Sequence, residues 1–505
     1  MNMPLVLLNR RRRGSVAFSP VSLFSAGEQG FWLEPSDLTT MFQDRAGTTP
    51  VTTPGQTVGL RLDKSKGLTL GAELVTNGDF SSGTGWTLGT GWAVSGGQAT
   101  FTATGANSAL TTVATAAAVS GRTYEIRYTV VSNTLNAGAL RLGGFSSASY
   151  SSAFQTLPST VGNQIFRFQS VPSGVGTVLD FWVTSTATSG SITIDNISVK
   201  ELLGNHAVAP TDAARPTYGI EPKTGRRNLL LATDTMATQS LTVTAVAHTL
   251  AFTGTGTVTL TGASIAGPLI GTGASNRVSL TFTPTAASLT LTVVGSVTLA
   301  QLEVGSTATA YQRVGTAFDV TEAGVPTVHY VQYDGVDDSF ATPTITPGID
   351  KAQVFAGVRK LSDAARGIIA EFGPDGQPGR LILQGPSANA TSNYGFSSFG
   401  STFVSTTTPQ SYAAPITNVI TGLGDISGDL ATLYANGTQV AQSVANQGTG
   451  NYLAYPLYIG RRGGTLLPFN GRDYGLIVRF GANLDASTIT ATETYLASKT
   501  SEVTL

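Results

Sequence analysis

Apolar and polar residues alternate along most of the chain, in short runs separated by clusters of turn-forming residues. Tyr124, Ile126, Tyr128 and Val130 illustrate the pattern, because side chains two positions apart point to the same face of an extended strand. The same spacing recurs in Phe166 and Phe168; Leu179, Phe181 and Val183; Val258 and Leu260; Val278, Leu280 and Phe282; and Leu289, Leu291 and Val293. This period-two pattern predicts an all-β protein built from antiparallel sandwiches.

The C-terminal third continues this pattern and adds the one predicted helix. Strands are expected at KAQVFAGVRK, RGIIAEFG, GRLILQG and ATLYANGTQVAQ, and Asn436-Gly437 in the last of these predicts a tight hairpin turn. Residues 484–500, LDASTITATETYLASKT, predict a short helix with Asp485 as its N-cap and Ile489 and Leu496 on one face. Lys499 in its last turn suits the helix dipole.

Composition limits the classes of function. The chain has 505 residues, enough for about three domains of 100–200 residues. Only 12% of the residues are charged and the net charge is −1, so the sequence lacks the excess of basic residues that is typical of nucleic-acid-binding proteins. No apolar run reaches 18 residues, which argues against insertion in a membrane. The absence of cysteine excludes disulfides, thiolate metal sites and thiol nucleophiles.

The N-terminal segment, MNMPLVLLNRRRRG, places its apolar stretch before the arginines, in the reverse order of a secretory signal. Arg10, Arg11, Arg12 and Arg13 belong either to a solvated terminus or to an arm that docks on an acidic neighbour in an assembly. Residues 1–29 are therefore interpreted as an attachment segment. The missing export signal, together with an outward-facing composition, suits a protein that is made in the host cytoplasm and carried out on a particle released by lysis.

One sequence signature occurs in three separate pieces. They are WLEPSDLTTMFQDRAGTTPVTTPGQTVGLRLDKSK (32–66), GNHAVAPTDAARPTY (204–218) and YVQYDGVDDSF (330–340), with spacers of 137 and 111 residues. Joined together, they resemble the opening of the concanavalin-like (laminin-G-like) jelly-roll domains of bacteriophage tail and virion proteins. Glu34 departs from the usual aspartate before Pro35, and DKSK departs from the usual DKSG where the first spacer begins.

Each spacer is long enough to be a complete β-domain. The first opens with ELVTNGDF and closes with SITIDNISVKEL, and both ends resemble the jelly-roll carbohydrate-binding-module superfamily. The second closes with QLEVGSTATAYQRV, which resembles the last strand of another phage sandwich module. We therefore expect three sandwich domains. A discontinuous concanavalin-like scaffold (30–69, 204–225 and 315–505) carries a carbohydrate-binding-module-like insert (70–203) and a small spacer sandwich (226–314).

Little in the sequence predicts catalysis. His206, His248 and His329 are isolated, without the spacing of a metal site or triad, and the resemblance gives His206 a structural role. Asp334, Asp337 and Asp338 form the densest carboxylate group. The resemblance implies a tight turn whose aspartates bind local amides, although a calcium site or a glycosidase pair would use the same residue type. We predict no enzyme activity and no catalytic residue.

Glycan binding requires exposed aromatic rings and a few polar partners. Trp86 and Trp92 are expected in the core. Trp182 with Asp180 is one candidate binding pair, and Tyr452, Tyr455, Tyr458 and Arg461 form another candidate cluster. Sandwich packing is the competing explanation for Trp182, and an edge strand kept soluble by arginine is the competing explanation for the tyrosines. No cofactor is expected, and Asp195 is the candidate for structural calcium, without assignable partner ligands.

The leading hypothesis is a non-enzymatic phage virion protein of the tail tip, baseplate or fibre that binds a host-surface glycan. Other virion proteins would be its partners, and a homo-oligomer, by analogy with fibres a trimer, would supply avidity. The first alternative is an architectural virion protein, a capsid decoration or baseplate spacer, that binds only other virion proteins. The second is a depolymerase of surface polysaccharide, which would depend on Asp337 and Asp338.

Overall fold

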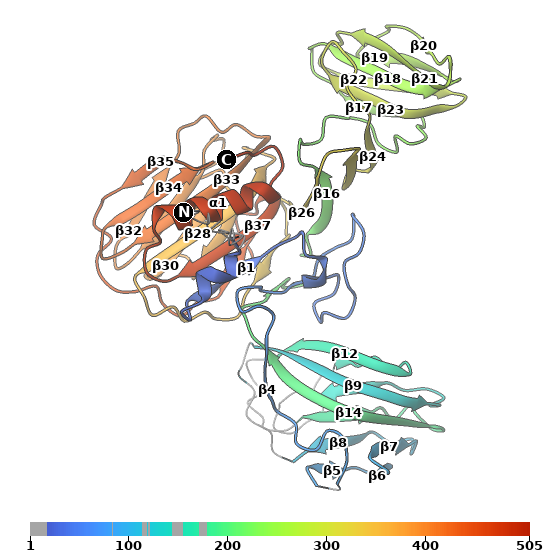
Figure 1. Ribbon diagram of the computed structural model, residues 1–505, viewed down its shortest axis with the longest axis vertical. Coiled ribbons are helices and arrows are strands. Elements are labelled where there is room, and N and C mark those ends of the chain that lie inside the picture. The colour runs from blue at the N-terminus through green and yellow to red at the C-terminus, as the bar shows by residue number, and fades with distance from the viewer. Residues whose placement is uncertain (1–17, 83, 114–118, 120–121, 144–154, 171–178) are drawn as a thin grey trace, which may run out of the picture.

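The computed structural model describes residues 18–505, apart from 83, 114–118, 120–121, 144–154 and 171–178. Its regular structure is almost entirely β-strand, with one α-helix at the C-terminal end, as the sequence predicts, and the strands pair antiparallel except at one parallel bridge between Ile220 and Asp319. Arg10 to Arg13 lie outside the described residues. None of the helices that the structure describes is long and apolar enough to cross a membrane. Figure 1 shows two β-modules projecting from a larger scaffold.

The first sheet of the scaffold contains strands from three distant parts of the chain. Its order is β2 (Met41–Phe42), β3 (Leu60–Arg61), β15 (Ala207–Val208), β27 (Phe340–Ala341), β36 (Leu457–Ile459), β29 (Ile368–Phe372), β30 (Arg380–Gln384), β31 (Gly395–Phe399) and β32 (Phe403–Thr407). Residues 41–61, 207–208 and 340–459 are thus hydrogen-bonded into one nine-stranded sheet. The chain leaves this sheet after β3 and returns to it at β15, then leaves again and returns at β27.

The second scaffold sheet has ten strands. Its order is β24 (Gln312–Thr316), β25 (Asp319–Glu322), β16 (Thr217–Pro222), β26 (Thr327–Asp334), β37 (Asn470–Phe480), β28 (Lys351–Lys360), β33 (Ile416–Asp425), β34 (Leu430–Ala435) and β35 (Thr438–Ser443), with β1 (Gln29–Leu33) paired to β37. Apolar side chains from both sheets, including Phe340, Phe396 and Val478, form one buried core between them.

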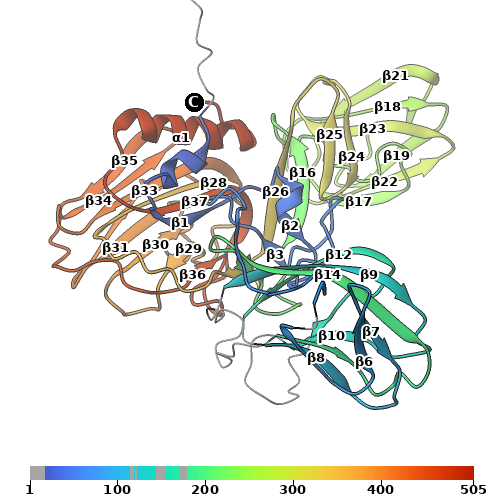
Figure 2. The ribbon, with the colours of Figure 1, turned by 60° about the horizontal axis from the view of Figure 1, so that its bottom comes forward.

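The helix α1 (Ala486–Lys499) and the 3-10 helix η1 (Pro20–Phe24) cover the outer face of the ten-stranded sheet (Figures 1 and 2). Asp485 caps α1 by accepting a hydrogen bond from the Thr488 amide at 2.7 Å, as predicted. Leu23 and Phe24 are each only 4% exposed, so the packed scaffold already includes residues before 29, which the sequence pattern did not indicate. A second 3-10 helix, η2 (Leu38–Thr40), follows β1.

The first insert, residues 70–203, folds into two sheets around its own core. One has the order β11 (Gln155–Thr156), β10 (Leu140–Gly143), β13 (Asp180–Val183), β8 (Ser108–Thr112) and β5 (Trp86–Leu88). The other has the order β12 (Gly162–Gln169), β9 (Thr123–Asn133), β14 (Ser191–Leu202), β7 (Gln98–Thr102) and β6 (Trp92–Ser95), with β4 (Leu70–Glu73) paired to β14. Trp86 and Trp92 lie in the core, as predicted.

The second insert, expected at residues 226–314, is a smaller sandwich whose own strands lie between Gln239 and Val304; residues 312–314 already belong to β24 of the scaffold sheet. Its sheets have the orders β17 (Gln239–Thr242), β22 (Ser288–Val294), β19 (Thr257–Gly262), β20 (Leu269–Ile270), and β21 (Gly273–Phe282), β18 (His248–Gly254), β23 (Val297–Val304). Its core is mainly aliphatic, with Phe252 and Phe282 as the buried rings. Arg227 forms an ion pair with Glu322 at 2.5 Å, which ties the insert to the scaffold strand β25.

Buried polar contacts explain the two motifs that flank the first insert. The Asp63 carboxylate accepts hydrogen bonds from the amides of Trp32 (2.9 Å) and Asn205 (2.7 Å). His206 Nδ1 in turn accepts from the Asp63 amide at 2.9 Å, and none of the His206 side chain is exposed. The DKS and GNHA motifs therefore close the scaffold where the chain leaves it and returns, which confirms the structural role of His206.

Candidate functional site

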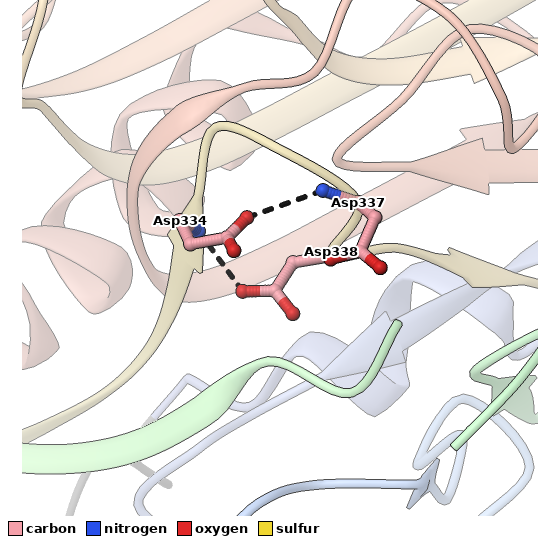
Figure 3. A group of neighbouring side chains, drawn as sticks. All are labelled: Asp334, Asp337 and Asp338. Carbon is pink, nitrogen blue, oxygen red and sulfur yellow. Dashed lines mark hydrogen bonds between the residues drawn. The ribbon is translucent and has the colours of Figure 1, made fainter. Parts of the chain in front are cut away.

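The three aspartates of the DGVDD motif lie in the turn after β26 (Figure 3). Asp338 Oδ2 accepts from the Asp334 amide at 2.9 Å, and Asp334 Oδ1 accepts from the amides of Val336 (2.7 Å) and Asp337 (3.3 Å). Gly335 has a φ of +78°, which the tight turn requires. The carboxylates of Asp334 and Asp338 thus hold the local backbone, as the sequence predicts, whereas only the backbone of Asp337 takes part in these hydrogen bonds.

One oxygen atom from each of the three carboxylates lies within 4.8 Å of the others, and this is the one such group of potential metal ligands among the described residues. Burial raises the pKa of Asp338 to about 7, and the charges of Asp334 and Asp337 act in the same direction. Asp195, the calcium candidate from the sequence, is not part of this group. Its Oδ1 accepts from the Asn196 amide at 2.6 Å, at a β-bulge of β14.

The first glycan candidate, Trp182 with Asp180, lies on β13. Phe181 and Val183 point into the core, so Trp182 and Asp180 point to the outer face of the sheet, as predicted. Trp182 is nevertheless only 6% exposed, which contradicts its expected role as an open aromatic platform. Burial raises the pKa of Asp180, although Thr111 donates a hydrogen bond to its side chain.

The expected exposure of Tyr452 in the second candidate cluster is wrong. None of its side chain is exposed, its ring packs 5.5 Å from that of Phe480, and its hydroxyl lies 2.7 Å from the Ser398 hydroxyl. Tyr455 packs partly against the same core, with its hydroxyl donating to the Pro378 carbonyl at 3.2 Å. Period-two spacing alone could not assign them, because residues 451–456 are outside the regular strands.

In contrast to Tyr452, the side chains of Tyr458 and Arg461 are partly exposed. Tyr458 lies on β36 opposite Glu371, between core residues Leu457 and Ile459, so its ring is on the outer face of the nine-stranded sheet. Burial raises the pKa of Tyr458, and the charge of Glu371 adds to this effect. Arg461 donates to the carbonyl oxygens of Asp337 (3.3 Å) and Thr465, so it links two turns.

Around Tyr458, the outer face of the nine-stranded sheet gathers aromatic and charged groups that the sequence did not single out. Arg380, Phe399 and Phe403 are aligned across β30, β31 and β32. The Arg380 guanidinium carbon is 5.6 Å from the centre of the Phe399 ring and 5.7 Å from that of Phe403. Phe403 is 45% exposed, so its aromatic ring is accessible to solvent while it packs against Arg380.

Two carboxylates and a second arginine complete this surface, which we call the arginine face. Arg462 donates to Glu371 Oε1 and Asp375 Oδ2, both at 3.0 Å, and Arg380 pairs with Asp375 at 2.6 Å. Burial raises the pKa of Glu371. Burial acts in the same direction on Asp375, but the hydrogen bond from Arg380 and the charge of Arg462 hold its pKa below the usual value.

The groups of the arginine face differ in how far they reach the solvent. Glu371 has none of its side chain exposed, so an acid at this position would not reach a substrate. The three histidines are likewise engaged or buried: His248 Nδ1 lies 2.8 Å from the Val246 carbonyl, and His329 Nδ1 lies 2.7 Å from the Tyr218 hydroxyl. The Phe403 ring is 45% exposed and the Asp375 side chain 56%, whereas the side chains of Arg380 and Arg462 are only 7% and 12% exposed. An accessible ring and a carboxylate held in place by arginines are groups that a sugar-binding surface uses.

No protein-family model and no curated protein sequence matches this chain. Several solved structures match part of it. The CBM40 module of the Ruminococcus gnavus IT-sialidase, solved with alpha2,3 sialyllactose, is 16% identical over 30% of this chain and 97% of that module, with a TM-score of 0.24.

Two larger proteins match a similar share of this chain. The botulinum neurotoxin serotype D binding domain is 13% identical over 32% of this chain and 41% of its own length, with a TM-score of 0.24. The NanB sialidase of Streptococcus pneumoniae is 12% identical over 32% of this chain and 27% of its own, with a TM-score of 0.25. At these scores the likeness does not assign a ligand to this chain.

Proposed function

We propose that this protein is a non-enzymatic virion protein of a bacteriophage tail tip, baseplate or fibre that attaches the particle to a host-surface glycan. The virion assignment is supported by the three-part signature, whose pieces contribute strands to a single jelly-roll scaffold. The arginine face is the observation that carries the glycan assignment. It combines an exposed ring, Phe403 on β32, with the exposed Asp375 carboxylate, which Arg380 and Arg462 hold in the turn after β29.

Side chains that are already held in place favour sugar binding, because they lose little conformational entropy when the ligand binds. Phe403 is fixed by its contact with Phe399, with ring centres 5.8 Å apart, and Asp375 is fixed by two arginines. A single sugar unit would bind weakly to so small a surface. Several copies on one particle would raise the overall affinity through effective concentration.

The experiment is binding of the fluorescently labelled, full-length protein to candidate host cells, before and after mild periodate oxidation of their surface sugars. We expect saturable binding that periodate abolishes and that protease treatment of the cells leaves intact. Antibodies against the protein should label purified phage particles in electron micrographs. Binding that survives periodate would contradict the glycan assignment. Labelled particles without any cell binding would favour the architectural role.

A further inference from the structure

One arginine beside the arginine face has no carboxylate partner among the described residues. Arg366 precedes β29, and its Nε and Nη2 both donate to the neutral Gln384 Oε1, at 2.9 and 2.6 Å. Its backbone amide donates to Asn389 Oδ1 at 2.8 Å, which places the exposed Asn389 side chain beside it. Arg366 is half-buried, so its guanidinium remains within reach of a ligand.

The nearby acidic groups are already used by other arginines. Glu371 and Asp375 pair with Arg380 and Arg462, so two carboxylates balance two guanidinium groups. Burial, followed by the positive charge of Arg462, lowers the pKa of Arg366, although the charges of Asp375 and Glu371 act in the opposite direction. Arg366 therefore adds a third positive charge to a face whose two carboxylates are each paired with other arginines, and a bound anion would supply the ion-pair partner that Arg366 lacks among the described residues.

The donor geometry indicates what kind of anion would fit. A guanidinium carries five N–H donors in a fixed planar fork, and Arg366 uses two of them on Gln384. The remaining three can meet two oxygen atoms of a carboxylate or a phosphate side by side. The Asn389 Nδ2 group donates to none of the described residues and could add a further hydrogen bond from the neighbouring loop.

We propose that Arg366 anchors an anionic group of the host polysaccharide, a sugar carboxylate or a phosphodiester, at the edge of the arginine face. This inference rests on the proposed glycan-binding function and specifies its ligand as acidic. Phe403 would then contact a sugar ring elsewhere on the same outer sheet face. The chain's overall charge of −1 would not attract such a polymer, so recognition would depend on this local charge.

The test measures binding of the full-length protein to three immobilised polymers: alginate, which carries carboxylates; a glycerol-phosphate polymer, which carries phosphodiesters; and dextran, which is neutral. We expect binding to at least one acidic polymer and none to dextran, with affinity that falls as salt rises. Arg366→Gln should lose at least tenfold in affinity. Arg366→Lys, which keeps the charge without the planar fork, should also bind more weakly than the wild type.

The matched control is Arg45→Gln, which removes the same charge from an exposed position elsewhere on the scaffold and should leave affinity unchanged. Calorimetry would verify that each variant unfolds like the wild type. Binding to alginate alone identifies the carboxylate, and binding to the phosphate polymer alone identifies the phosphodiester. Equal binding to dextran, no binding to either acidic polymer, or Arg366→Gln within twofold of the wild type would overturn the inference.

The outcome is separable from that of the proposed function. If the wild type binds host cells in a periodate-sensitive manner, while Arg366→Gln binds the cells equally well, the glycan is neutral at this position and only the present inference fails. If the wild type binds no host cells and no polymer, the proposed function fails with it.

Discussion

The guanidinium of Arg61 lies 2.5 Å from the carboxylate of Asp473, although 412 positions of sequence separate the two residues. Their side chains are 1% and 5% exposed, so the ion pair is buried between the two scaffold sheets. Arg61 ends β3, before the first insert, whereas Asp473 lies on β37, after both inserts. This contact therefore requires the chain to have closed around both inserts.

Removing one partner of this pair should destabilise the scaffold. Asp473→Asn leaves a buried, unpaired guanidinium, and we expect a loss of about 3–5 kcal/mol in the free energy of unfolding. The control is Asp212→Asn, which breaks an exposed pair with Arg215 at 3.7 Å and should cost less than about 1 kcal/mol. Calorimetry of both variants measures the difference. Equal, small losses would mean that the Arg61 contact contributes little.

Stability at acidic pH should depend on Glu34. Burial acts to raise its pKa, but hydrogen bonds from Lys64 and Ser36 outweigh burial and lower the pKa from 4.5 to about 2. A lowered carboxyl pKa contributes stability that is complete above about pH 4.5 and is lost as the pH falls towards 2. The contribution is on the order of 3 kcal/mol. Glu34→Gln should flatten the stability profile in this window, and an unchanged profile would refute the assignment.

Asp338 should have the opposite effect. Its folded-state pKa of about 7 lies above the ordinary 3.8, so ionising it costs stability as the pH rises from about 4 to 7. Asp338→Asn should therefore be more stable than the wild type at pH 8, by about 1–3 kcal/mol, and equally stable at pH 4. Asp337→Asn should gain less. If Asp338→Asn were instead less stable than the wild type at pH 8, and a chelator lowered the stability of the wild type to that of the variant, the result would indicate a bound cation.

Phe403 should matter for binding and not for folding. Because its ring is 45% exposed, Phe403→Ala should change the free energy of unfolding by less than about 1 kcal/mol. The loss of an exposed stacking ring should weaken cell binding at least fivefold. The control is Val444→Ala, which truncates a side chain that is 72% exposed on the same scaffold. Loss of binding in both variants would contradict a specific role for the ring.

The sequence predicted those features that depend on local pattern. The all-β class follows from alternation, the helix cap from Asp485 at the start of residues 485–499, and the hairpin from Asn436-Gly437, which connects β34 and β35. Asn436 and Gly437 have φ values of +48° and +76°, as such a turn requires. The resemblance also implied that the aspartates of the DGVDD turn bind local amides, and hydrogen bonds confirm this for Asp334 and Asp338.

The candidate site depends on strand register, which one sequence does not reveal. Arg380 alternates with the core residues Leu381 and Leu383, so the sequence pattern alone indicates that its side chain points away from the core. Its alignment with Phe399 and Phe403 depends on which strands pair, and that information comes only from the assembled sheet. Tyr452 was misassigned for a related reason, because a tyrosine between strands enters the core only once the sandwich has closed over it.

The most direct test of host attachment is competition between the purified protein and the intact phage for adsorption to host cells. The account predicts that saturating amounts of the folded wild-type protein block adsorption, and that Arg366→Gln and Phe403→Ala block it less effectively at equal concentration. Undiminished adsorption in the presence of saturating, correctly assembled protein would contradict the attachment function and favour the architectural role.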